Sequence, residues 1–102
     1  MIRPVVFRRI ARQEFDEAVV WYETERAGLG LEFSDAVDEK IALIARQPTL
    51  FRKIRGAIRR AVLKRFPYTI HFVDEPDRIV ILAVFHAARD PSALRHREGV
   101  FR

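Results

Sequence analysis

Residues 68–85, YTIHFVDEPDRIVILAVF, decide the fold of this chain. Over residues 68–73 apolar and polar side chains alternate, which predicts a β-strand with one buried face. The Asp-Glu-Pro-Asp run over 74–77 predicts a turn, because the proline ring presets the backbone for one. Residues 79–85 are all apolar. This run predicts a central strand that is covered on both faces.

The strand pattern continues on either side of this pair. Residues 58–63 predict a preceding strand that ends before Phe66-Pro67, and residues 5–7 predict a short opening strand. Three consecutive strands on short connections favour an antiparallel meander.

Two amphipathic helices are predicted between the opening strand and the meander. The first covers about residues 10–26, and the second ends near Gln47, because Pro48 disfavours helical geometry before it. The apolar stripes are Ala11, Phe15, Ala18 and Tyr22, then Phe33, Val37, Ile41 and Ile44. Gly28 and Gly30 end the first helix, and so short a break predicts an antiparallel helical hairpin.

The elements together predict a single α+β domain over residues 1–102, in the order β-α-α-β-β-β with a short C-terminal tail. One face of the sheet is expected to pack against the hairpin, and the basic residues are expected to gather on the other face. No apolar run is long enough to span a bilayer, and no export signal follows the N-terminus. The absence of cysteine excludes disulfides and thiol catalysis and favours a cytoplasmic location.

The charge of the chain is unevenly distributed. The net charge is +5, but residues 1–51 carry −2 and residues 52–102 carry +7. The stretch from Arg52 to Arg65 holds seven basic residues and no acidic one. This asymmetry predicts an acidic or polyanionic partner for the second half of the chain. The alternative is a basic surface that only faces water.

Metal and cofactor sites are not predicted. His71, His86 and His96 lie on different segments without the close spacing that metal ligands require. Gly28-Leu29-Gly30 follows a helix rather than a strand, so it does not form a phosphate-binding loop.

Two groups of residues are candidates for chemistry or target binding. In the strand over 58–63, Ala61 and Leu63 share the predicted packed face, which leaves Arg60 and Lys64 exposed. A β-bulge in this strand would invert the arrangement, so the sequence leaves open which face is exposed. The second group, His86 to Asp90, follows the central strand, and strand ends commonly carry functional side chains.

Several motifs follow one another over about residues 7–97. They are Glu17-Ala18-x-x-Trp21-Tyr22-Glu23, Gly28-Leu29-Gly30-x-x-Phe33, Ile58-Arg59-Arg60, Arg65-Phe66-Pro67-Tyr68-x-Ile70-x-Phe72, and His86-x-x-Arg89-Asp90-Pro91 with Arg97 downstream. In this order they resemble the ParE/RelE superfamily, the toxins of bacterial type II toxin–antitoxin (plasmid stabilisation) modules. The resemblance implies the same fold, a helical hairpin on an antiparallel sheet.

The resemblance is closer to ParE than to RelE. ParE-like toxins are regarded as inhibitors that bind DNA gyrase, not as enzymes. RelE-like nucleases carry an arginine directly after the tyrosine of the third strand, where this chain has Tyr68-Thr69, and they use a C-terminal tyrosine that is absent here. The target-binding residues implied for this chain are Arg59, Arg60, Lys64, Arg65, Arg89 and Arg97.

Two other functions remain as alternatives. One is a RelE-like, metal-independent mRNA endonuclease acting in the ribosome. In it His86, Arg89, Arg60 and Lys64 would supply acid–base and charge-stabilising groups. The other is a non-toxic nucleic-acid-binding module, although the chain lacks alternating surface aromatic residues for base stacking.

A cognate antitoxin is implied by every toxin reading. It would present an acidic segment that folds on binding to the toxin. Trp21 and Tyr22 are the expected anchors for it, if the helical hairpin leaves them uncovered. The alternative for Trp21 is a place in the core.

Overall fold

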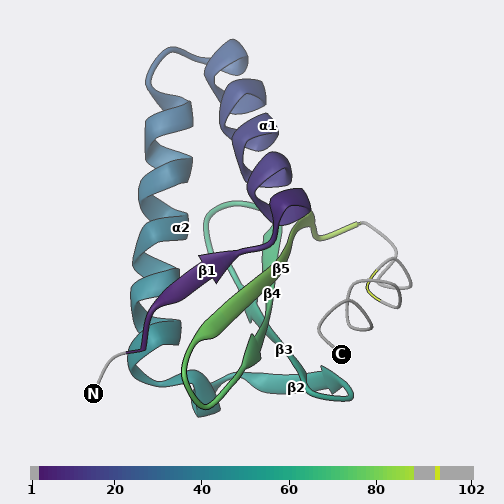
Figure 1. The fold of residues 1–102 in the computed structure, drawn as a ribbon. Helices are drawn as coiled ribbons and strands as arrows, with labels where there is room; N and C mark the ends of the chain where they lie inside the picture. The colour runs from purple at the N-terminus through teal and green to yellow at the C-terminus, as the bar shows by residue number, and fades with distance from the viewer. Residues whose placement is uncertain (1–2, 89–93, 95–102) are drawn as a thin grey trace.

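The structure, a computed structural model, describes residues 3–88 and Leu94. They form a helical hairpin packed on one sheet (Figure 1). The elements are β1 (Val5–Phe7), α1 (Arg9–Glu25), α2 (Leu29–Arg46), the 3-10 helix η1 (Pro48–Leu50), β2 (Arg52–Arg55), β3 (Ile58–Val62), β4 (Tyr68–Asp74) and β5 (Ile79–His86). The predicted C-terminal tail lies outside the described residues, except for Leu94.

The five strands form one sheet in the order β1-β5-β4-β3-β2. Strands β2 to β5 are antiparallel neighbours, and β1 lies parallel to β5. The predicted fold class and element order are confirmed, but the meander has four strands instead of three. Strand β2 is not predicted from the sequence, because its residues, Arg-Lys-Ile-Arg, show no alternation of apolar and polar side chains. It forms at the edge of the sheet, where charged residues are tolerated because neither face must be fully buried.

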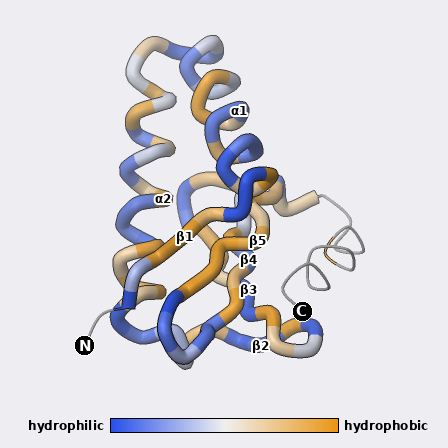
Figure 2. The backbone as a smooth tube through the Cα atoms, in the orientation of Figure 1, coloured by the Kyte–Doolittle hydropathy of each residue, from blue (hydrophilic) through white to orange (hydrophobic). Residues whose placement is uncertain are grey.

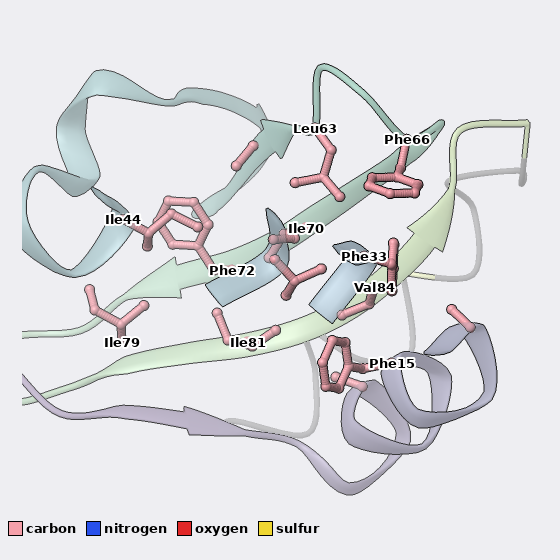
Figure 3. Close-up of a cluster of buried hydrophobic side chains, with 14 of the residues drawn as sticks. Phe15, Phe33, Ile44, Leu63, Phe66, Ile70, Phe72, Ile79, Ile81 and Val84 are labelled. Atoms are coloured by element: carbon pink, nitrogen blue, oxygen red, sulfur yellow. The ribbon is translucent and has the colours of Figure 1, made fainter. Parts of the chain in front are cut away.

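The hairpin packs on one face of the sheet around the ring of Phe33, which is fully buried. The centroid of this ring lies 4.9 Å from that of Tyr22, 5.2 Å from Phe66 and 5.1 Å from Tyr68. Aromatic pairs at such distances stabilise a core by about 0.5–1.5 kcal/mol each beyond the burial of their area. Figure 3 shows Phe33 and Phe66 beside each other within this cluster. These rings join α1 and α2 to β4, so they set the position of the hairpin on the sheet.

A second apolar cluster covers the opposite face of the sheet. Its buried members are Ile58, Val80, Leu82, Ala83, Phe85 and Leu94. Leu82 and Ala83 both face this side, because a register shift in the β4–β5 ladder places an extra residue in β5. The expectation that the basic residues gather on this face is therefore wrong for the half formed by β4 and β5. Figure 2 shows hydrophobic residues along β5.

The turn between the helices depends on a carboxylate. Gly28 adopts the left-handed conformation at φ 89°, which suits glycine. Glu23, near the end of α1, accepts hydrogen bonds from the backbone N–H groups of Gly28 and Gly30, both at 3.0 Å. A negative charge at this position also interacts favourably with the N-terminal end of α2.

Gly30 is expected to resist substitution although it lies within a helix. A Cβ atom at this position would lie 2.7 Å from the carbonyl oxygen of Val19 and 2.9 Å from the Glu23 carboxylate. We predict that Gly30→Ala lowers the free energy of unfolding by about 1–3 kcal/mol, because the two helices must separate. Chemical denaturation would measure the change.

The matched control is Leu31→Ala, since the Leu31 side chain is 66% exposed. That variant should change the free energy of unfolding by less than about 0.5 kcal/mol. A Gly30→Ala protein as stable as the wild type would show that the helices are not in close contact at this position.

Candidate functional site

The consecutive arginines of β3 lie on opposite faces of the sheet. Arg59 lies on the hairpin side, where its guanidinium donates a hydrogen bond to the carbonyl oxygen of Phe51 at 2.8 Å. Arg60 lies on the other side, opposite His71 of β4 in the strand register. Ala61 and Leu63 are buried, which confirms the predicted parity of this strand. Arg59 therefore has a structural contact, whereas Arg60 is exposed.

Lys64 and Arg65 lie at a separate place, in a groove of about 610 Å³ beside α2. The groove also contains the acidic residues Glu32, Asp35 and Glu39. Arg65 forms an ion pair with Glu32. Hydrogen bonds from Arg65 and then from Arg26 hold the pKa of the Glu32 carboxyl below its ordinary value. The charge of Arg65 is thus partly neutralised within the protein.

His86 is placed on the hairpin side of the sheet, at the end of β5. Its ring centroid lies 5.4 Å from that of Tyr68, which packs against the hairpin-side core. Arg60 is on the other face, so the structure does not bring together the predicted nuclease residues His86 and Arg60. The remaining predicted residues Arg89 and Arg97 lie outside the described part of the chain.

Thr69 is nearly buried on the face that carries Arg60, with 8% of its surface exposed. It is opposite Val62 of β3 and Phe85 of β5 in the register, and its hydroxyl donates a hydrogen bond to the Phe85 carbonyl oxygen at 3.5 Å. The position that carries an arginine in RelE-like nucleases is therefore flanked here by two apolar side chains.

A cleft of about 300 Å³ lies between α1 and the open edge of β5. Its lining residues are Glu14, Glu17, Ala18, Trp21, Tyr68, Val84 and His86. Glu14 accepts a hydrogen bond from the backbone N–H of Val84 at 3.1 Å, on the edge that β1 leaves open. Trp21 is 55% exposed, and its ring makes an edge contact with Tyr22 at 5.0 Å. This arrangement offers an aromatic ring beside two carboxylates.

Tyr22 does not share this exposure. Only 8% of its surface is accessible, because its ring packs against Phe33, Phe66 and Tyr68. The expectation that Trp21 and Tyr22 both lie uncovered is therefore wrong for Tyr22, which lies in the core. Adjacent residues of a helix point about 100° apart, so one can be buried while its neighbour is exposed.

Burial also affects the two tyrosines chemically. It raises the pKa of the Tyr22 phenol above its ordinary value of 10.0, with a further contribution from the nearby Tyr68. The pKa of Tyr68 is raised by burial and, in second place, by the negative charge of Glu14. Both phenols therefore favour the neutral form in the folded protein.

Among residues 3–88 and Leu94, no three histidine or acidic side chains form a group suited to a metal ion. No helix in the same part of the chain is long and apolar enough to cross a membrane.

Two features of these surfaces are not evident from the sequence. Glu14 resembles any other helical carboxylate in sequence, and only the fold places it against Val84 at the open edge of β5. Arg52 and Lys53 were part of the basic stretch, but their strand was not predicted. The short turn at Gly56, followed by the β-pattern from Ile58, is the signal that could have indicated a hairpin.

The fold and these surfaces define a small α+β protein with a basic sheet edge and an aromatic–acidic cleft. The family model for the ParE toxin of the type II toxin–antitoxin system parDE matches residues 5–91. The chain therefore belongs to the ParE toxin family, the toxin components of type II toxin–antitoxin systems.

Two solved structures share the fold. A chain of the chromosomal ParDE toxin–antitoxin system from P. aeruginosa superposes with a TM-score of 0.73 and 16% identity, over 83% of this chain and 96% of that one. A chain of the RelBE2 toxin–antitoxin complex from Mycobacterium tuberculosis superposes with a TM-score of 0.60 and 17% identity, over 84% of this chain and 99% of that one. No curated protein matches the sequence.

The raised pKa values predict a loss of stability in alkaline solution. Above pH 10 the unfolded chain releases the phenolic protons of Tyr22 and Tyr68, whereas the folded chain retains them. The unfolded state then binds fewer protons, so the free energy of unfolding must fall as the pH rises above 10.0. Denaturation midpoints and the ultraviolet absorbance of phenolate, measured across this range, would test the prediction.

Tyr68→Phe is the diagnostic variant, because it removes one of the two phenols. Its stability should depend less on pH than that of the wild type in the same range. Phenolate absorbance that rises with an ordinary tyrosine pKa in the folded protein would contradict the prediction.

Proposed function

We propose that this toxin acts as ParE-like toxins do, by binding DNA gyrase in the cytoplasm and stalling it, and that it is not a nuclease. The observation that supports the proposal is that apolar side chains surround Thr69. RNA cleavage through the 2′-hydroxyl needs groups that move protons and cations that stabilise the charge developing on the phosphate. Around Thr69 the register instead places Val62 and Phe85, with Leu94 in the same apolar cluster as Phe85.

The positions of the other candidate nuclease residues support the same conclusion. His86 and Arg60 lie on opposite faces of the sheet, and Lys64 lies in the groove beside α2. A substrate phosphate cannot contact groups on both faces of a sheet at once. Loss of one charge-stabilising group in such a site slows catalysis about 10²–10³-fold.

The alternative function, a ribosome-dependent mRNA endonuclease, has one observation in its favour. Arg60 and His71 are opposite each other on the same face of the sheet, where a histidine could move a proton and the arginine could stabilise phosphate charge. His71, however, is only 3% exposed, with its ring 5.3 Å from that of Phe85. A substrate would need the neighbouring side chains to move before it could reach this histidine.

The toxin assignment also supports a cognate antitoxin as the partner. The cleft between α1 and β5 is the surface that we infer it occupies, because Trp21 there is a large exposed ring beside a concave site. Exposed tryptophans of this kind commonly dominate the binding energy of an interface. Glu14 and Glu17 at the cleft favour a basic or neutral side chain next to Trp21, even if the rest of the antitoxin segment is acidic.

The target is tested with the purified toxin in two parallel assays. We expect it to inhibit supercoiling by DNA gyrase and to leave ribosome-bound mRNA intact. Gel electrophoresis of plasmid topoisomers measures the first activity, and primer extension on translated mRNA measures the second. Codon-specific cuts in the mRNA together with normal supercoiling would establish the nuclease alternative instead.

The antitoxin surface is tested by Trp21→Ala. Binding to the cognate antitoxin should weaken by about 2 kcal/mol or more, because the ring is the anchor of the proposed interface. Val20→Ala is the matched control, since Val20 is an equally exposed neighbour on α1, at 63%, that does not line the cleft. Calorimetric titration of both variants, with circular dichroism to verify folding, makes the comparison; equal affinities would place the antitoxin elsewhere.

A further inference from the structure

We propose that the hairpin formed by β2 and β3, here called the basic ribbon (residues 52–60), binds the phosphate backbone of double-helical DNA. The inference deepens the proposed function and rests on it in one respect, since gyrase holds DNA at the place where this toxin would act. The ribbon lies at the edge of the sheet, with β2 as the outermost strand (Figure 1). Its turn contains Gly56 at φ 52°.

The first observation is that like charges face each other across the ribbon. Arg52 is directly opposite Arg60, and Lys53 is directly opposite Arg59. Cross-strand pairs of like charge destabilise an antiparallel ladder. The strand that creates both pairs, β2, has half-buried Ile54 as its only large apolar residue. The apolar packing of β2 therefore offsets little of the repulsion between these positive charges.

The second observation is that, among residues 3–88 and Leu94, no acidic side chain forms an ion pair with the ribbon. In the described part of the chain, ion pairs are formed by Arg3, Arg12, Arg26, Arg65 and Arg78. None of these residues belongs to the ribbon. Arg52 and Arg60 are both exposed, whereas Arg59 of the second pair lies on the other face and is held by Phe51. An external polyanion would therefore provide the missing counter-charge at the Arg52–Arg60 pair.

The exposed side chains of the ribbon suit a phosphate ligand better than they suit an acidic protein. Protein interfaces depend on a few large apolar or aromatic anchors. Of the described residues with a large exposed apolar side chain, Val62 alone belongs to the β2–β3 hairpin, and it lies at the end of β3, beyond the residues paired with β2. Phosphate binding requires no such anchors, and the planar arginine guanidinium matches phosphate oxygens in a two-pronged contact.

The composition of the ribbon favours a double helix over single-stranded RNA. Strand β3 is also paired with β4, so the ribbon is the edge of a wider sheet and would lie along the phosphate backbone of a duplex, not inside its groove. Single-stranded RNA is bound largely by base stacking on aromatic side chains. The ribbon has no aromatic residue. The structure therefore assigns to it a sequence-independent contact with DNA phosphates.

The test measures the fluorescence anisotropy of a labelled, mixed-sequence DNA duplex with the purified toxin over a range of salt concentrations. In Arg52→Gln/Arg60→Gln we expect affinity to fall at least about ten-fold at low salt. The slope of log affinity against log salt should become shallower by about two, one for each lost phosphate contact. The variant should remain folded, because the exchange removes a like-charge pair.

Two further variants control for charge and geometry. Arg9→Gln/Arg12→Gln removes the same charge from α1, whose neighbours β1 and β5 lie toward the other edge of the sheet. It should keep most of the affinity and the slope. Arg52→Lys/Arg60→Lys keeps the positive charge and should keep the slope, with at most a small loss of affinity.

Equal DNA binding by the Gln ribbon variant and the α1 control would overturn the proposal. So would tighter binding of polyglutamate or of a single-stranded RNA of equal length through the same two arginines. The gyrase assay separates this failure from that of the proposed function. Gyrase inhibition that persists without DNA binding leaves the function standing and refutes the ribbon contact, whereas ribbon-dependent DNA binding without inhibition refutes only the gyrase proposal.

Discussion

The apolar character of β5 on both faces is the constraint on which the rest of the structure depends. Seven consecutive buried residues, from Ile79 to Phe85, must be covered on two sides. The helical hairpin covers one side through Phe15 and Phe33, and the cluster that includes Leu94 covers the other. Each such side chain contributes about 1.5–3 kcal/mol when fully buried. This requirement is met with β5 inside the sheet, between β1 and β4.

Because the centre of the sheet is buried, the polar surfaces that are candidates for binding lie at its margins. The cleft with Trp21 and Glu14 lies at the edge of β5 that β1 leaves open, and the basic ribbon lies at the opposite edge, on β2 and β3. The two surfaces carry opposite charge, so they suit different partners. The proposed antitoxin and DNA contacts therefore lie at opposite margins of the sheet.

The sequence allowed much of the fold to be predicted and less of the candidate site. Helical periodicity located α1 and the end of α2 to within one residue, and alternation located β3, β4 and β5, because burial repeats along the chain. The prediction that Gly30 ends the first helix is wrong, since Gly30 lies in the first turn of α2. Strand β2 carries no such repeat, since its residues are exposed or half-buried. Tyr22 belongs to the apolar stripe of α1, so the periodicity that located this helix also predicts that Tyr22 is buried, and the expectation that it anchors an antitoxin is wrong. Its ring packs against Phe33 and Phe66.

The sequence by itself determined the α+β class, the hairpin, the buried central strand and membership of the toxin superfamily. These properties follow from periodicity and local motifs, which a linear pattern records completely. Only the tertiary structure decided which basic residues share a surface. Register places Arg52 opposite Arg60, sends Arg59 to the other face, and separates both from Lys64 and His86. The physical reason is that strand pairing and the β5 bulge are long-range relations, and no local pattern in the sequence encodes them.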